Sequence, residues 1–126
     1  MKSISLQDIL DAAWQAFIVE RQPPGYDKEA SMCMYLTDDG RKCAVGLVLP
    51  DGHPAQQQLD SLGELVGTYP ELFDRQLWHM GTYRLDSFQR LLHDDMIDHD
   101  TGTWKDQDLR KRYVYAAEEY GLTLPE

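Results

Sequence analysis

The chain has 126 residues, with 12 Lys or Arg against 22 Asp or Glu, which gives a net charge of −10 at pH 7. This length suits one hydrophobic core and is too short for two conventional ones. Apolar residues make up 42% of the chain, as in ordinary globular domains rather than disordered or membrane proteins. The negative charge disfavours direct binding to nucleic acid or to an anionic membrane, and it favours a partner with a basic surface.

The first predicted element is an amphipathic helix over residues 5–20. Apolar residues recur there at spacings of three and four positions: Leu6, Ile9, Leu10, Ala13, Ala16 and Phe17. Ser5 suits the N-cap, and Asp8 is the acid of a capping box that satisfies two backbone donors at the helix start. Pro23, Pro24 and Gly25 then end the helix.

A β-hairpin is predicted over residues 32–49. Its two strand-like runs flank Asp39 and Gly40, and an Asp-Gly pair in this position strongly favours a hairpin turn. The small residues Ala44 and Gly46 predict that another element packs closely against this ribbon.

Four further helices are predicted from apolar residues at helical spacing. They cover approximately residues 54–67, 70–79, 84–98 and 103–120. Thr103 and Asp106 suit a capping box at the start of the last helix, and Gly121 followed by Leu122 suits a Schellman ending. The predicted fold is therefore α+β, a mostly α-helical single domain over residues 1–126 with one small antiparallel hairpin.

The two cysteines, Cys33 and Cys43, are too few for a disulfide framework. We expect both to be reduced, packed thiols. An acid, Asp8, lies where a secretory signal would be apolar, and no apolar run approaches the length of a membrane span. The expected location is therefore the cytoplasm.

A group of imidazoles and carboxylates near residues 93–100 could ligate a divalent cation. On an ideal helix two residues six positions apart point about 120° from each other, so joint ligation by His93 and His99 requires the helix to end between them. One hypothesis is therefore a small metal-dependent hydrolase. Its ligands would be His93, Asp94, His99 and Asp100. The alternative interpretation is a solvated acidic helix end.

Acidic residues are concentrated between positions 86 and 108, where seven Asp face only Arg90 and Lys105. Carboxylates on a rigid helix can resemble phosphates and occupy a nucleic-acid-binding groove, which is the principle of DNA mimicry. The same charges also increase solubility. We expect a surface for a basic partner protein at Asp86, Asp94, Asp95 and Asp98. A small basic cluster follows in the sequence: Lys105, Arg110, Lys111 and Arg112.

One stretch of the chain carries a distinctive motif. Its residues, in chain order, are Cys33-Met-Tyr35, Gly40-Arg-Lys-Cys43-Ala-Val-Gly46 and Pro50-Asp51. In this stretch the chain resembles a group of small uncharacterised proteins encoded by tailed bacteriophages and prophages, although Leu47 stands where that group has a further cysteine. The resemblance implies a viral or prophage origin and a role directed at the host, and it carries over no catalytic activity.

The sequence thus predicts an accessory protein of a phage or prophage, in the host cytoplasm, that binds a host protein and inhibits or modulates it. The expected target is an antiviral defence or nucleic-acid-processing protein with a basic surface. No catalytic residue, cofactor, membrane or direct nucleic-acid contact is expected. The rival hypothesis is the metal-dependent hydrolase described above.

Overall fold

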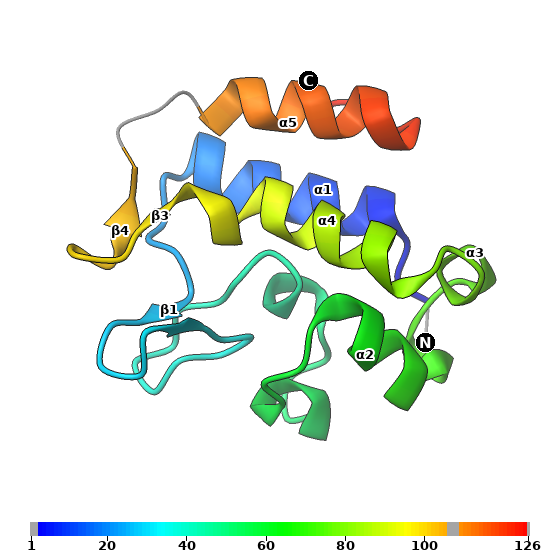
Figure 1. The fold of residues 1–126 in the computed structure, drawn as a ribbon, viewed down its shortest axis with the longest axis horizontal. Helices are drawn as coiled ribbons and strands as arrows, with labels where there is room; N and C mark the ends of the chain where they lie inside the picture. Colours follow the sequence, from blue (N-terminus) through cyan, green and yellow to red (C-terminus); the bar gives the residue numbers. More distant parts are fainter. Residues whose placement is uncertain (1–2, 106–108, 126) are drawn as a thin grey trace.

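The computed structural model describes residues 3–105 and 109–125 (Figure 1). The α+β, mostly helical fold is confirmed. Its α-helices are α1 (Leu6–Ala13), α2 (Leu62–Thr68), α3 (Arg75–Trp78), α4 (Thr82–Leu92) and α5 (Leu109–Tyr120). The strands are β1 (Tyr26–Asp27), β2 (Met32–Cys33), β3 (Ile97–Asp98) and β4 (Thr103–Trp104). A π-helix, η1 (Trp14–Val19), extends α1, and four short 3₁₀-helices are η2 (Gly46–Val48), η3 (Pro54–Gln57), η4 (Pro70–Leu72) and η5 (Asp94–Met96).

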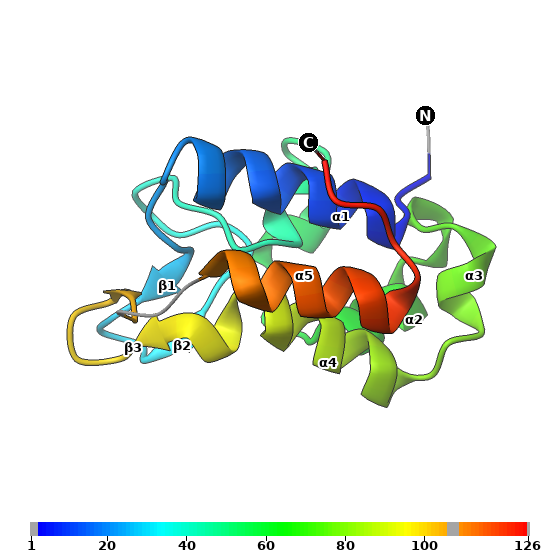
Figure 2. The ribbon, with the colours of Figure 1, turned by 90° about the horizontal axis from the view of Figure 1, so that it is seen from above.

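Three helices, α1, α4 and α5, lie side by side with nearly aligned axes, and α5 covers the line between α1 and α4 (Figures 1 and 2). The two-stranded ribbons β1–β2 and β3–β4 lie together at one end of this helical layer, and α3 lies at the opposite end (Figures 1 and 2). Apolar side chains from α1, η1, α2, α4 and α5 share one core with residues 43–45. None of the described helices is long and apolar enough to cross a membrane.

The start of α1 follows the predicted capping box. The Asp8 N–H donates to the Ser5 hydroxyl, and the Ser5 N–H donates to the Asp8 carboxylate, both at 3.0 Å. The helix reaches the predicted length, but from Trp14 onward its turns widen, so that the Glu20 N–H reaches the carbonyl of Gln15 at 2.9 Å. The extent of the helix was thus predictable from apolar spacing, whereas the change to π geometry was not.

The predicted hairpin over residues 32–49 is wrong in its pairing. Strand β2 pairs antiparallel with β1, with Tyr26 opposite Cys33. The second predicted strand approaches the first only briefly, where the Cys43 N–H donates to the carbonyl of Met34 at 3.2 Å. It then turns into η2. The physical reason is that residues 43–46 are all buried, whereas a ribbon strand with one solvated face alternates buried and exposed positions.

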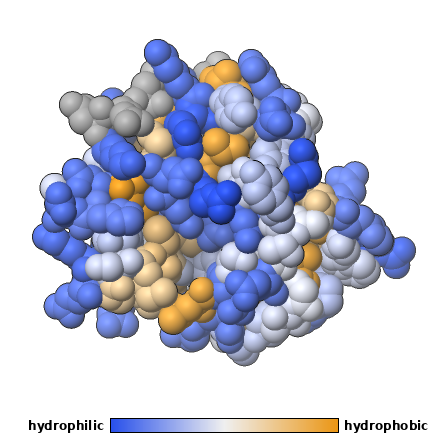
Figure 3. All heavy atoms as spheres, in the orientation of Figure 1, coloured by the Kyte–Doolittle hydropathy of each residue, from blue (hydrophilic) through white to orange (hydrophobic). Residues whose placement is uncertain are grey.

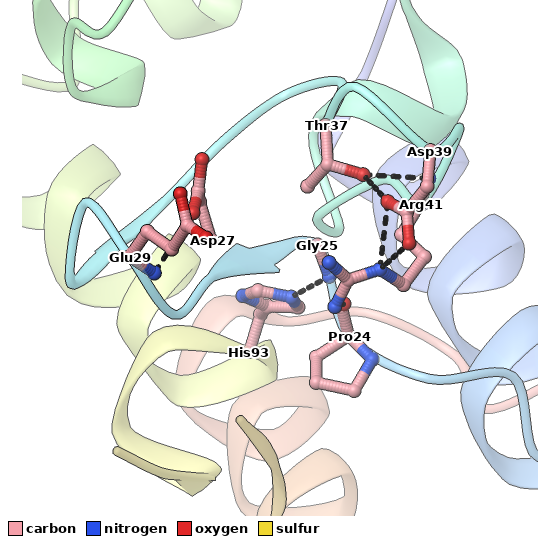
Figure 4. Close-up of polar contacts among 8 residues, drawn as sticks. All are labelled: Pro24, Gly25, Asp27, Glu29, Thr37, Asp39, Arg41 and His93. Carbon is pink, nitrogen blue, oxygen red and sulfur yellow. Dashed lines mark hydrogen bonds and ion pairs between the residues drawn. The ribbon is translucent and has the colours of Figure 1, made fainter. Parts of the chain in front are cut away.

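The turn inside the predicted hairpin does form. The Thr37 N–H donates to the Arg41 carbonyl at 2.8 Å, and the Thr37 hydroxyl donates to the Asp39 carboxylate. The hydroxyl of Thr37 and the guanidinium of Arg41 lower the pKa of Asp39. Arg41 also donates to the Pro24 carbonyl at 3.3 Å, which ties the turn to the segment that leaves η1 (Figure 4).

Gly25 provides the close approach that displaces the predicted pairing. Its carbonyl accepts from the Met34 N–H at 2.8 Å. A Cβ at Gly25 would overlap the backbone of Lys42 and Cys43. Because Gly25 has no side chain, the segment that leads into β1 can lie against Lys42 and Cys43 and bond the N–H of Met34 next to β2.

Two of the later predicted helices are split. The helix predicted over 54–67 is interrupted because a new capping box, formed by Ser61 and Glu64, starts α2. The helix predicted over 70–79 is interrupted because Phe73 is extended and forms a bridge with Ile4. On either side of Phe73, the Ile4 N–H donates to the Leu72 carbonyl at 2.8 Å and its carbonyl accepts from the Asp74 N–H at 2.9 Å.

The last two predicted helices are shorter than expected. The helix predicted over 84–98 ends at Leu92, because His93 leaves the helical conformation and buries its ring. The described part of the helix predicted over 103–120 begins at Leu109. Thr103, the predicted N-cap, lies in β4, and Asp106 lies outside the described residues. The Schellman ending is confirmed: Gly121 has a φ of 66°, and the Leu122 N–H donates to the Ala117 carbonyl at 2.8 Å.

Candidate functional site

A cleft of about 360 Å³ lies between the β2 segment, α2 and α4. Four carboxylates line it: Asp60, Glu64, Asp86 and Asp94. Two thiols, Cys33 and Cys43, and a single cation, Arg90, also line it. We refer to it below as the acidic cleft.

Contacts between α4 and the first turn of α2 fix one wall of the acidic cleft. The Asp86 carboxylate accepts from the Gly63 N–H, and the side-chain carbonyl of Gln89 accepts from the Leu62 N–H, both at 2.8 Å. The first N–H groups of a helix have no partner within the helix, so these two side chains satisfy donors that would otherwise be unpaired. The position of the Asp86 carboxylate is therefore set by the packing of two helices.

His93, directly after α4, fixes the other wall. Its side chain is fully buried, and its Nε2 accepts from the Gly25 N–H at 3.0 Å (Figure 4). Its Nδ1 lies 2.8 Å from the Asp94 carboxylate. Since Nε2 accepts, the proton of the neutral ring is on Nδ1, which donates to Asp94. The ring also packs edge-on against Trp104, with centroids 5.3 Å apart, and against Phe17 at 5.6 Å.

Cys33 completes a cluster with His93 and Asp94. One potential ligand atom from each of the three lies within 4.8 Å of the others. The sequence singled out His93 and Asp94 as ligands but not Cys33. However, both nitrogens of His93 already have partners. A metal at Nδ1 would require the proton on Nε2, where it would face the Gly25 N–H. This arrangement therefore does not favour metal binding by His93.

The other two candidate ligands lie in the segment joining β3 and β4. His99 lines a cavity of about 430 Å³ together with Cys33 and Asp94, but neither His99 nor Asp100 belongs to the cluster of ligand atoms within 4.8 Å. The His99 ring stacks on Tyr26 with centroids 5.1 Å apart, and the Asp100 N–H donates to the Asp98 carboxylate at 2.9 Å. The helix ends at Leu92, before His93, so neither histidine is in it, and the structure does not bring the ligand atoms of all four residues together. The hydrolase hypothesis gains no support from this geometry.

The two thiols are free in the structure. Burial, followed by the negative charge of Asp94, raises the pKa of Cys33 well above the usual range. The same two causes raise the pKa of Cys43 to about 12. A nucleophilic cysteine needs a lowered pKa in an electropositive setting. The acidic cleft provides the opposite setting, which agrees with the expectation that both thiols are packed and unreactive.

The four acids predicted to bind a partner do not share a helix. Asp86 is on α4, Asp94 and Asp95 are in η5, and Asp98 is in β3. Only Asp86 and Asp94 line the acidic cleft. Asp95 is exposed and lies 3.3 Å from Arg112.

Asp60 and Glu64, which also line the cleft, were missed by the sequence analysis. Periodicity describes one element at a time and does not reveal which elements meet. The Ser61-x-x-Glu64 pattern could have located the start of α2, but nothing in the sequence places this turn opposite Asp86.

Comparison with known proteins adds no relative. No protein-family model matches the chain, and neither a curated protein nor a solved structure is significantly similar to it. The function is therefore argued from the acidic cleft.

Proposed function

We propose that the protein binds a partner protein by accepting a Lys or Arg side chain of that partner in the acidic cleft. One observation carries the proposal: four carboxylates line a single cleft with Arg90 as the only cation beside them. Ammonium and guanidinium groups form short, charge-assisted hydrogen bonds with carboxylates. A cleft of this charge and size is suited to a basic side chain.

Two of the four carboxylates are oriented before any partner arrives. Asp86 is held by the Gly63 N–H and Asp94 by His93. Groups already fixed in position lose little conformational freedom on binding, so more of the interaction energy contributes to affinity. The raised pKa of Cys33 and the occupied nitrogens of His93 favour this binding role over thiol or metal catalysis.

The biological role follows from the resemblance to phage and prophage proteins and from the net charge of −10. The partner is a host protein whose function depends on an exposed basic side chain, as in defence and nucleic-acid-processing proteins. Occupying that side chain inhibits or modulates the host protein. Capture of one basic side chain is favoured over imitation of a DNA strand, because the acids expected to form a row are divided among α4, η5 and β3.

The test compares two double variants that each remove two negative charges. Asp60→Asn/Asp94→Asn removes two of the four carboxylates of the acidic cleft and retains an amide oxygen to accept from His93. Asp38→Asn/Asp100→Asn changes two exposed acids that do not line the cleft. Each protein is expressed with an affinity tag in a bacterial host, and co-purifying proteins are quantified by mass spectrometry.

We expect a host protein that co-purifies with the parent and with the Asp38/Asp100 variant and is depleted with the cleft variant. Its dissociation constant for the cleft variant should rise about tenfold or more, since a hydrogen bond to a charged group is worth about 1.5–3 kcal/mol. Retention of the partner by the cleft variant, or no partner of the parent protein, would show that the proposal is wrong.

A further inference from the structure

A second, larger cavity of about 690 Å³ lies between α4 and α5. Residues from α4, η5 and α5 line it, and three of them are basic: Arg90, Lys111 and Arg112. Lys111 and Arg112 belong to the basic cluster that follows the acidic segment in the sequence, and neither of them lines the acidic cleft. We refer to this cavity as the basic groove.

The charge of the basic groove is opposite to that of the protein as a whole. Three of the twelve Lys and Arg residues line it in a chain with a net charge of −10. Asp95 is the only acid among its lining residues. It reaches Arg112 through one contact of 3.3 Å between partly exposed side chains, a type of ion pair that contributes only about 0–1 kcal/mol. The positive charge of the groove is therefore incompletely neutralised by the described residues.

Arg112 has an unused donor. Its Nε is buried and has no hydrogen-bond partner among the described residues, whereas its Nη2 donates to Asp95. A buried donor without a partner is uncommon and costs free energy. Nε and Nη2 of a guanidinium form a planar fork that fits two oxygens of a phosphate. A shift of the Arg112 side chain that exposes the buried Nε to the groove would let an oxyanion replace the single contact with Asp95 and satisfy both donors.

The remaining walls of the groove indicate what the anion is attached to. Tyr115 and Leu91 supply aromatic and apolar surface, and the Tyr115 side chain is 53% exposed. The face of the molecule in front of α4 is otherwise mainly hydrophilic, with only small, separate apolar areas (Figure 3). Planar bases stack favourably on exposed aromatic rings, and ligand pockets generally enclose about 300–1,000 Å³.

We propose that the basic groove binds a mononucleotide, with its phosphate on Arg90, Lys111 and Arg112 and its base against Tyr115. This site shares only Arg90 with the acidic cleft and does not depend on the proposed partner binding. The negative charge elsewhere on the protein disfavours long nucleic acids, so the ligand is a small molecule with one phosphorylated end.

The test titrates ¹⁵N-labelled protein with AMP, inorganic phosphate or adenosine at low ionic strength, with calorimetry for the dissociation constants. AMP is expected to shift amide signals of α4 and α5 in a saturable manner and to bind more tightly than either fragment. The Lys111→Gln variant should weaken AMP binding at least threefold, and Arg90→Gln/Lys111→Gln more than tenfold. Lys28→Gln, the matched control on the β1–β2 connection, should leave it unchanged.

Three further variants separate the parts of the ligand. Tyr115→Ala should weaken AMP binding and leave phosphate binding unchanged. Arg112→Lys keeps the positive charge but removes the fork, and it should weaken both. Asp95→Asn removes the competing carboxylate and should tighten both. Thermal unfolding shows that each variant is folded.

Three results would overturn the assignment. The first is that AMP causes no saturable shift of the amide signals. The second is that AMP and adenosine bind with equal affinity, and the third is that AMP and inorganic phosphate do so. If AMP fails to bind, the proposal of partner capture by the acidic cleft still stands. That proposal is tested with variants at Asp60 and Asp94, which do not line the basic groove.

Discussion

The backbone N–H of Gly25 donates a 3.0 Å hydrogen bond to Nε2 of His93, although the two residues are 68 positions apart in the chain. This bond places the ring proton on Nδ1, where Asp94 accepts it. It therefore connects the loop after η1 with a wall of the acidic cleft. His93, which the sequence proposed as a metal ligand, is buried, and both of its ring nitrogens have partners.

Replacing His93 with Phe tests this structural role. Phe approximately preserves the ring volume but leaves the Gly25 N–H buried and unpaired and removes the donor to Asp94. The free energy of unfolding should fall by about 1–3 kcal/mol, the cost of an unsatisfied buried donor. Urea denaturation measures it, and Asp94→Asn, which keeps an acceptor oxygen, should have a smaller effect. A His93→Phe variant as stable as the parent would contradict the assigned hydrogen bonds.

Two glycines should respond in opposite directions to replacement by Ala. A Cβ at Gly46 would overlap the backbone carbonyl of Tyr35, whereas a Cβ at Gly67 would meet nothing within 4 Å. Gly46→Ala should cost about 1–3 kcal/mol because a fixed backbone has to move. Gly67→Ala, inside α2, should stabilise by about 0.5–1 kcal/mol because Ala is the better helix former. Equal effects in urea unfolding would show that the packing at Gly46 is looser than described.

The buried thiols predict a loss of stability at alkaline pH. Burial raises the pKa of Cys43 from 9.0 to about 12 in the folded protein. Between these values the unfolded chain releases the thiol proton and the folded chain retains it. Stability is therefore full below about pH 9 and falls as pH rises, by up to about 1.4 kcal/mol per pH unit for this thiol.

Unfolding measured from pH 7 to pH 11 checks this slope. Cys43→Ala should lower stability at pH 7, because it leaves a cavity, but should give a shallower pH dependence. At pH 8 both thiols should react slowly with a thiol reagent in the native protein and rapidly in urea. Rapid native reaction of Cys43 would contradict its burial.

The kinetics of partner binding should distinguish the acids of the cleft from those outside it. Complementary charge mainly accelerates association, and salt weakens this effect. Asp60→Asn/Asp94→Asn should lower the association rate constant and flatten its dependence on ionic strength. Asp95→Asn/Asp98→Asn should change both less, because these residues do not line the cleft. Surface plasmon resonance with the captured host protein at several salt concentrations measures the association rate constants. Equal reductions for the two double variants would favour a diffuse acidic surface.

Two helix boundaries set by neighbouring residues were predictable, whereas Thr103, predicted as an N-cap, lies in β4. The capping box of Ser5 and Asp8 and the ending at Gly121 and Leu122 both formed as expected, because each depends on hydrogen bonds within a few residues. The hairpin failed for the opposite reason. Its Asp-Gly turn formed locally, but the strand pairing was decided by Gly25, which the sequence indicated only as a helix terminator.

The candidate site was predicted in part. The sequence drew attention to His93 and Asp94 because imidazole and carboxylate groups can ligate a divalent cation. It could not show that Cys33 lies beside them or that Asp60 and Glu64 face Asp86, since these contacts arise from the packing of α2 and β2 on α4. Site residues that are neighbours in the sequence could be predicted, whereas site residues that meet only through the packing of separate elements could not.

The contacts of Gly25 also limit which substitutions this position can accept during evolution. One residue supplies the donor for His93, the acceptor for Met34 and a surface without a side chain against Lys42 and Cys43. A replacement other than Pro keeps the backbone N–H and C=O, but its Cβ would push this backbone away from Lys42 and Cys43 and so disturb the bonds to His93 and Met34. Compensation by one further mutation is therefore difficult. We expect natural variants to keep glycine at this position while the exposed acids around it change freely.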